Sequence, residues 1–156
     1  MINKEITDRL ISLISEYTQD LKEAAASYKK FSGFKKDKKI QRYVERTLQI
    51  DIEACLDLAN HIISEKGFRE PSSNADTFYI LCENKIIPMP FFNKLKDMAS
   101  FRNLMVHNYA KVDVEKVYGI LKRHLKDFDM YLSYVIEFLE REKVIKSKKQ
   151  KKIRHK

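Results

Sequence analysis

Tryptophan is absent from this sequence of 156 residues, and glycine and proline, with 3 residues each, are scarce. The two cysteines, Cys55 and Cys82, are far apart without metal-type spacing, and we expect both to be small buried side chains. No apolar run approaches the ~20 residues of a membrane span, and the first residues lack the hydrophobic region of a signal peptide. These scarcities exclude a disulfide scaffold and a β-sandwich, and they favour a cytoplasmic protein that spans no membrane.

What is abundant instead is a mixture of apolar and charged residues at helical spacing. Hydrophobic residues make up 44% and charged residues 34% of the chain, which is long enough for one domain with a buried core. The spacing predicts a first helix over Lys4–Phe31, capped by Gly33, and a second over about Asp37–Lys66, closed by Gly67. The second helix is apolar on more than one side, so we expect it to be central or shared with a partner chain.

Two breaks divide the second half of the chain. Turn-forming residues over 68–77 lead into a short helix at about 75–84, and the prolines of residues 88–90 precede a helix that starts near Phe91. A last long helix is expected after Asp113, whose side chain suits the N-cap. The expected fold is therefore all-α, an antiparallel four-helix bundle with an additional short helix.

The net charge of +9 is unevenly distributed along the chain. Residues 141–156 hold nine basic residues and one acidic residue, which gives +8, whereas residues 1–140 hold 22 basic and 21 acidic residues, which gives +1. We therefore divide the chain into a helical domain over 1–145 and a basic C-terminal tail over 146–156, which is either disordered or an extension of the last helix. Such a tail adds either non-specific RNA affinity or only solubility.

Four polar side chains of different chemistry gather within eight residues, namely Arg102, Asn103, His107 and Tyr109. Arg102 and His107 are five residues apart, or about 140° around an ideal helix, so they converge only near a helix end or across a two-fold axis. Arginine holds a phosphate through two parallel donors, and histidine transfers protons near neutral pH. Such a set suits metal-independent cleavage of RNA, whose 2′-hydroxyl is an internal nucleophile, although a chance cluster at a helix end is an alternative.

Other polar residues follow less specific patterns. His61, Asp57 and Glu53 share one face of the second helix, where a surface ion pair fits as well as an acid–base or metal role. Basic residues around the first turn suit either RNA attraction or plain solvent exposure. The RNA-binding candidates are Lys35, Lys36, Lys38, Lys39 and Arg46. No dense carboxylate or Cys/His cluster predicts a metal site.

The string Arg102-Asn103-x-x-x-His107-x-Tyr109, at the end of an apolar helix, resembles the signature of the HEPN superfamily and, within it, the HepT toxin ribonucleases. Segments at 43–49, 58–63, 71–73 and 117–121 also occur in the order typical of that family. The resemblance covers roughly residues 5–135 and does not reach the basic tail.

This resemblance implies the toxin of a type VII toxin–antitoxin system, a two-fold homodimer that cleaves RNA without a metal or cofactor. It implies Arg102 as the phosphate holder, His107 as the acid–base and Asn103 as the orienting residue. Tyr109 would receive AMP from ATP through an MntA-like nucleotidyltransferase antitoxin, and the added bulk and negative charge would repel RNA. RNA cleavage needs one group that accepts a proton and one that donates a proton, and the motif holds one histidine per chain. A two-fold axis beside the motif would supply the second histidine.

Two other functions stay open at the level of the sequence. A catalytically silent HEPN-type module would bind a nucleotidyltransferase partner or a nucleotide through the same residues. A basic bundle that binds nucleic acid without catalysis would lose binding on removal of residues 146–156 and would tolerate the replacement of His107.

Overall fold

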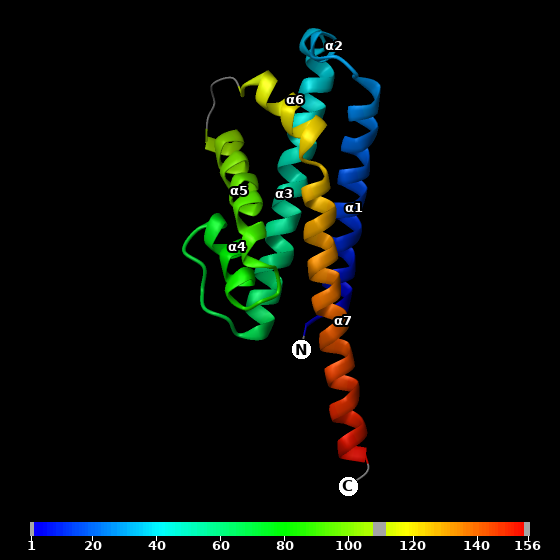
Figure 1. The fold of residues 1–156 in the computed structure, drawn as a ribbon, viewed down its shortest axis with the longest axis vertical. Coiled ribbons are helices and arrows are strands. Elements are labelled where there is room, and N and C mark those ends of the chain that lie inside the picture. Colours follow the sequence, from blue (N-terminus) through cyan, green and yellow to red (C-terminus); the bar gives the residue numbers. More distant parts are fainter. Residues whose placement is uncertain (1, 108–111, 155–156) are drawn as a thin grey trace.

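The computed structural model describes residues 2–107 and 112–154, with side chains through Lys143, and every regular element in those ranges is helical (Figure 1). The all-α expectation is thus confirmed for the described chain. In chain order, the elements are α1 (Lys4–Ser27), α2 (Phe31–Lys36), α3 (Lys38–Lys66), α4 (Asn74–Glu83), the 3-10 turn η1 (Met89–Phe91), α5 (Phe92–His107), α6 (Val114–Arg123) and α7 (Lys126–Arg154).

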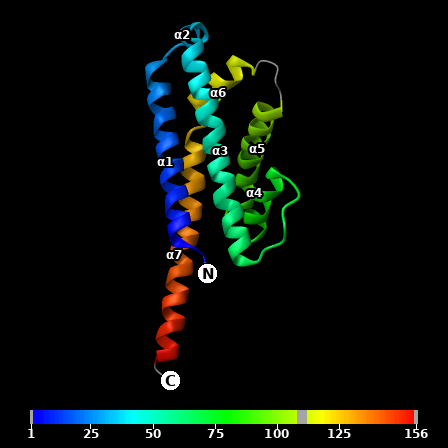
Figure 2. The ribbon, with the colours of Figure 1, turned by 180° about the vertical axis from the view of Figure 1, so that it is seen from behind.

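The bundle consists of the long helices α1, α3, α5 and α7, each of which runs opposite to the one before it (Figures 1 and 2). α1 and α7 pack together beside α3, and α4 and α5 lie on its other side. α3 contacts α1, α2, α4, α5 and α6, so the helix with apolar residues on several sides is the central one. The expected antiparallel four-helix bundle is confirmed, with α2, α4 and α6 as short additions.

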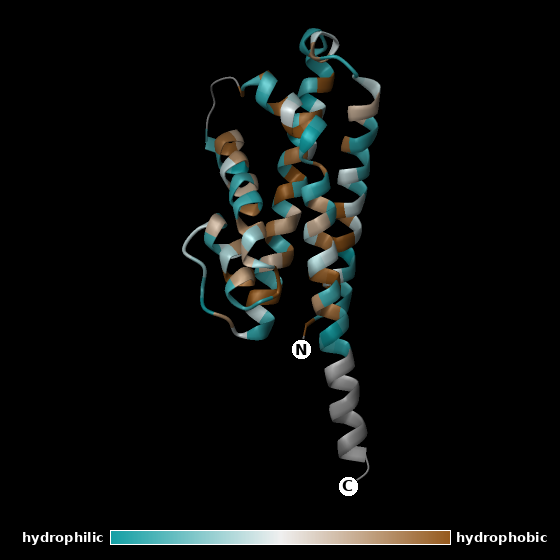
Figure 3. Ribbon diagram, in the orientation of Figure 1, coloured by the Kyte–Doolittle hydropathy of each residue, from teal (hydrophilic) through white to brown (hydrophobic). Residues whose placement is uncertain are grey.

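The core lies between these helices, whose facing surfaces are mostly apolar (Figure 3). Tyr131 of α7 is fully buried, and its hydroxyl donates to the carbonyl oxygen of Cys55 on α3 at 2.7 Å. The ring of Tyr131 also meets Phe78 of α4 edge-on. Cys55 and Cys82 are both buried, as predicted. These contacts hold α3, α4 and α7 together as a rigid platform for α5.

Local sequence signals set both ends of α3. Asp37 is its N-cap, and a carboxylate oxygen accepts from the backbone N–H of Ile40 at 3.1 Å. Gly67 follows the last turn with φ of 67°, in the left-handed region that favours glycine at a helix C-terminus. The bounds predicted for this helix are therefore confirmed.

The single first helix predicted over Lys4–Phe31 is wrong at its end. α1 stops four residues earlier, and Gly33 is not its cap but lies inside the separate helix α2. The cause is tertiary, because the Tyr28 hydroxyl donates to a carboxylate oxygen of Asp37 at 2.6 Å and Phe34 is buried with its ring edge-on to Tyr28. Burial of these aromatic side chains turns the backbone before the expected cap.

The last long helix predicted after Asp113 is in fact two helices. Asp113 caps α6 as predicted, since its side chain accepts a hydrogen bond from the first turn at 3.0 Å. The chain then breaks at His124 and Leu125, and α7 begins at the next residue. α6 lies across one end of the bundle (Figure 1), where the Tyr118 hydroxyl donates to the carbonyl oxygen of Tyr28 at 2.9 Å. A continuous helix would not make this contact.

The backbone of α7 stays helical to Arg154 and extends beyond the ends of the other helices (Figure 1). The helix therefore includes residues of the basic tail, and the division of the chain after residue 145 stays a prediction. Among the helices described, none is both long enough and apolar enough to cross a membrane.

Candidate functional site

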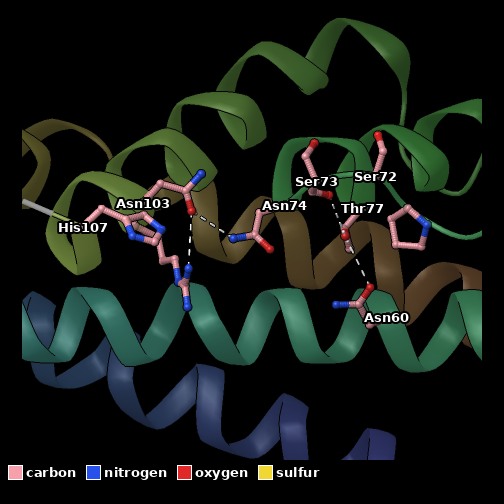
Figure 4. A pocket seen from close by; sticks show the side chains of 9 residues that line it. Asn60, Ser72, Ser73, Asn74, Thr77, Asn103 and His107 are labelled. Carbon is pink, nitrogen blue, oxygen red and sulfur yellow. Dashed lines mark hydrogen bonds between the residues drawn. The ribbon is translucent and has the colours of Figure 1, made fainter.

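Three of the four motif residues line one open pocket beside α5. Arg102, Asn103 and His107 lie on its last turns and face the start of α4 across a space of about 490 Å³ (Figure 4). The other lining residues come from α3, from the loop before α4 and from α4 itself, and they are Asn60, Pro71, Ser72, Ser73, Asn74 and Thr77. The fourth motif residue, Tyr109, lies outside the described residues.

Arg102 and His107 reach the same pocket although an ideal helix separates them by about 140°. His107 is the last residue of α5 and its side chain is exposed, whereas the Arg102 side chain is only 24% exposed. Of the two arrangements that the spacing allows, a helix end and a two-fold axis, the helix end at His107 is present in the single chain. The pocket therefore combines the largely buried guanidinium of Arg102 with the accessible imidazole of His107.

Arg102 is anchored to the central helix. Its Nε donates to Oε1 of Glu53 on α3 at 3.3 Å, and the same carboxylate oxygen accepts from Nε2 of Gln49 at 3.1 Å. Its Nη1 donates to Oδ1 of Asn103 at 3.4 Å. Within the described residues these bonds use two of the five N–H groups of the guanidinium, and the others are available to an anion.

Asn103 connects the two sides of the pocket. Its Oδ1 accepts from Arg102 and also from Nδ2 of Asn74 at the start of α4, at 2.9 Å (Figure 4). Two donors on one oxygen fix the orientation of the amide, which in turn supports the guanidinium. This geometry fits the orienting role that the family resemblance implies for Asn103.

Acidic residues of α3 lie beneath the arginine. Partial burial raises the pKa of Asp57, the negative charge of Glu53 raises it further, and the positive charge of Arg102 lowers it. Further along the same helix, Nε2 of His61 is buried and has no hydrogen-bond partner in the described part of the chain. Across those same residues, no group of three or more His, Cys, Asp or Glu side chains is arranged to hold a metal ion.

The loop before α4 forms a braced outer wall. Arg69 makes two bonds of 2.8 Å to the two carboxylate oxygens of Asp76, and both the backbone N–H and the hydroxyl of Ser72 donate to Asp76 Oδ2. The hydrogen bonds from Arg69, followed by that from the Ser72 backbone, hold the pKa of Asp76 far below its usual range. The Ser73 hydroxyl accepts from the Asp76 backbone N–H at 3.0 Å and caps α4. Bidentate pairing and capping fix this wall without any ligand.

The residues predicted to bind RNA lie elsewhere on the molecule. They are exposed on α2 and on the first half of α3, and none of them lines the pocket. They are Lys35, Lys36, Lys38, Lys39 and Arg46. Their contribution to RNA binding stays a prediction.

Several pocket residues had no specific signal in the sequence. Glu53 was considered for a different set, with Asp57 and His61, and its pairing with Arg102 spans 49 positions of the chain. Asn60 and residues 71–73 stood in segments that resemble the family, but the sequence assigned neither of them a role. Asn74 read as an ordinary turn residue within the polar, turn-forming residues 68–77, which predicted a loop.

Comparison with known proteins places this chain in a family. The family model described as ribonuclease HepT-like matches residues 14–135. The chain is 32% identical over 130 residues to the mRNA nuclease HepT of Shewanella oneidensis, covering 83% of this chain and 98% of the relative. It is 23% identical over 143 residues to the tRNA nuclease HepT of Aphanizomenon flos-aquae, covering 88% of this chain and 92% of the relative.

A solved structure with the same fold is the tri-AMPylated HEPN toxin of Shewanella oneidensis in complex with an MNT antitoxin. The TM-score is 0.77 at 30% sequence identity, and the match covers 86% of this chain and 99% of the toxin. A toxin–antitoxin complex with AMP-PNP matches with the same TM-score, identity and coverage. The match to the family model ends at residue 135, before the basic C-terminal extension.

Proposed function

Because the chain belongs to the ribonuclease HepT-like family, we propose that it is an endoribonuclease and the toxin of a type VII toxin–antitoxin pair. The observation that carries the proposal is the meeting of Arg102, Asn103 and His107 in one open pocket. Relatives named as mRNA and tRNA nucleases support the reaction class. Solved complexes of similar toxins with antitoxins support the biological role.

The proposed cleavage is metal-independent because RNA carries its own nucleophile. The 2′-oxygen attacks the adjacent phosphorus and gives its proton to a base, the bond from phosphorus to O5′ breaks, and O5′ takes a proton from an acid. The products are a 2′,3′-cyclic phosphate and a 5′-hydroxyl end. Arg102 holds the phosphate with the N–H groups that Glu53 and Asn103 leave available, and it stabilises the charge that develops on the phosphate oxygens.

His107 supplies one proton-transfer group, while the reaction uses two. We propose a two-fold homodimer in which the His107 side chains of both protomers serve one cleft, one as base and one as acid. Support comes from the placement of His107 at the exposed end of α5, where a second chain has access to it. Sedimentation of the purified chain at twice the monomer mass would agree with this arrangement.

Neutralisation of the toxin is proposed to act on Tyr109, two residues after His107. A nucleotidyltransferase of the MntA type would use ATP to attach AMP to the tyrosine hydroxyl, with release of pyrophosphate. The added phosphate brings negative charge and bulk to the motif and repels RNA. A similar toxin described as tri-AMPylated in complex with its MNT antitoxin supports this proposal. The chain itself needs no cofactor in this scheme.

The direct test is incubation of the purified chain with RNA in the presence of EDTA, followed by analysis of the product ends. The proposal expects cleavage with 2′,3′-cyclic phosphate and 5′-hydroxyl ends. Cleavage that disappears with EDTA and returns with magnesium would refute metal independence. Absence of cleavage, together with tight binding to the nucleotidyltransferase, would favour the catalytically silent module.

A further inference from the structure

One wall of the pocket is polar but carries no charge. It is made by Asn60 of α3, by residues 71–73 of the braced loop, and by Asn74 and Thr77 of α4, and it faces Arg102 and His107 (Figure 4). Taking the proposed ribonuclease function as given, we propose that this wall is a nucleobase subsite. In it, the Asn60 amide selects the base of the nucleotide next to the scissile phosphate.

The charges around the wall favour a neutral ligand over a second phosphate. Arg102 is the permanent cation among the pocket-lining residues, and Glu53 already pairs with one of its edges. Asp57 lies on α3 between Glu53 and Asn60. A phosphate beside Asn60 would therefore be repelled by these carboxylates, and no second permanent cation among the pocket-lining residues would offset the repulsion. A nucleobase brings hydrogen-bonding groups without charge and fits this environment.

The bonding of Asn60 determines which base edges it recognises. Its side-chain carbonyl oxygen lies 3.3 Å from the Thr77 hydroxyl, which shares its single proton with the carbonyl oxygen of Ser73 at 3.2 Å, and Asn60 itself is exposed. The carbonyl oxygen keeps a second lone pair, so the amide presents both a donor and an acceptor to a ligand. Asparagine recognises adenine with such a pair, donating to N7 and accepting from the N6 amino group. We therefore expect adenine to be preferred at this subsite.

The distance between the subsite and the proposed phosphate position is fixed by the fold. Asn60 lies seven residues after Glu53 on α3, about 10 Å along the helix from the carboxylate that anchors Arg102, a length that one nucleoside can span. The opposite side of the wall is fixed by the Arg69–Asp76 pair and by the bond from Asn74 to Asn103. A preformed wall recognises a base without the entropic cost of ordering a loop.

The test is the base preference of cleavage within a randomised RNA, read by sequencing the cut ends. For the natural chain we expect adenine to be preferred about tenfold at one fixed position beside the cut, as one bidentate hydrogen-bond pair would produce. Asn60→Ala should reduce that discrimination to less than about twofold, and so should Asn60→Asp, whose carboxylate cannot donate to N7. Asn93→Ala, an exposed asparagine of α5 outside the pocket lining, is the matched control and should keep the natural profile.

A second measurement separates failure of the subsite from failure of the nuclease proposal. Trinucleotides carrying 2′-O-methyl groups cannot be cleaved, and their binding to the natural chain and to Asn60→Ala can be followed by calorimetry for each base. Tighter binding of the adenine trinucleotide, with the difference abolished in Asn60→Ala, supports the subsite even if no RNA is cut. Cleavage with an identical base profile in the natural chain and Asn60→Ala would overturn the subsite and leave the nuclease proposal standing. Base-independent binding would overturn it as well.

Discussion

The helical body and the C-terminal extension of this chain differ in charge and in chemistry. Residues 1–140 are nearly neutral, with 22 basic and 21 acidic residues, yet they hold the pocket of Arg102, Asn103 and His107. Residues 141–156 carry a net +8 on the continuation of a helix. Positive charge attracts any nucleic acid backbone, whereas cleavage needs groups held in a fixed geometry. The total of +9 therefore reports attraction to polyanions and says little about the reaction.

The two regions also lie at opposite ends of the bundle. α5 ends near α6 and α2, whereas the extension of α7 leaves the bundle beyond the end where α1 begins (Figures 1 and 2). RNA held by the extension of one chain is thus not delivered into the pocket of that same chain by proximity alone. The comparison predicts separate effects, on rate for the pocket and on affinity for the extension.

Replacing His107 should have the largest effect on the rate. His107→Ala removes the group proposed to transfer protons, and general acid–base catalysis contributes about 10²- to 10⁴-fold. Cleavage of a short RNA under single-turnover conditions should fall by that factor, while the melting temperature stays the same because the side chain is exposed. Natural rates in this variant would show that the pocket of the body is not the site of the reaction.

Removing the Asn74 side chain should have a smaller effect on rate. Asn74→Ala deletes the donor to Asn103 Oδ1, and the loss of about 1 kcal/mol of hydrogen bonding corresponds to a rate decrease of about fivefold. The decrease should appear in the single-turnover rate at saturating RNA and not in the dissociation constant. Asn93→Ala serves as the control on α5, and equal rates for both variants would contradict a positioning role for Asn74.

Neutralising the extension should affect affinity and leave the rate at saturation within about twofold. Replacement of Lys146, Lys148, Lys149, Lys151 and Lys152 by Gln removes five charges at constant chain length. The slope of log affinity against log salt should become shallower by about 0.7 for each phosphate of single-stranded RNA that these lysines no longer neutralise. An unchanged slope, measured by fluorescence anisotropy, would show that the extension does not touch the RNA.

A buried carboxyl group of the body should affect stability alone. Burial, together with the charge of Asp129, raises the pKa of Asp51 to about 8, against a lowering hydrogen bond from Thr18 at 2.7 Å. The folded chain therefore keeps a proton that the unfolded chain releases near pH 4, and this contribution to stability is lost as the pH rises from about 4 to about 8.

Asp51→Asn removes this linkage because the amide has no proton to release. Its free energy of unfolding should be close to that of the natural chain at pH 4 and higher by about 2–4 kcal/mol at pH 8, as denaturant titrations would measure. RNA cleavage should stay at the natural rate, since Asp51 does not line the pocket. A difference in stability that is constant with pH would refute the raised pKa.

The sequence predicted those features of the fold that depend on neighbouring residues. Asp37 and Gly67 set the ends of α3 through their own backbone and side-chain chemistry, so its bounds were predictable. The end of α1 was not, because Tyr28 turns away to meet Asp37 and Phe34. The break at His124 has no glycine or proline to mark it, and it follows from the packing of α6 across the end of the bundle.

The same distinction applies to the pocket. Arg102, Asn103 and His107 stand within six residues of one helix, so their convergence was visible in the spacing once the helix was placed to end there. Asn60 and Asn74 reach the pocket from other elements, and Glu53 pairs with Arg102 from α3, contacts that only the tertiary fold makes. Partners across a pocket are set by helix packing, which a single sequence does not specify.

The most direct measurement compares two full-length variants on the same short RNA at about 0.15 M salt, near physiological ionic strength. One is His107→Ala with its extension intact, and the other has the five extension lysines replaced by glutamine with the pocket intact. We predict that, at saturating protein, the neutralised variant cleaves at nearly the natural rate and His107→Ala cleaves about 10²- to 10⁴-fold more slowly. Cleavage by His107→Ala at the natural rate, together with loss of cleavage in the neutralised variant, would contradict the account.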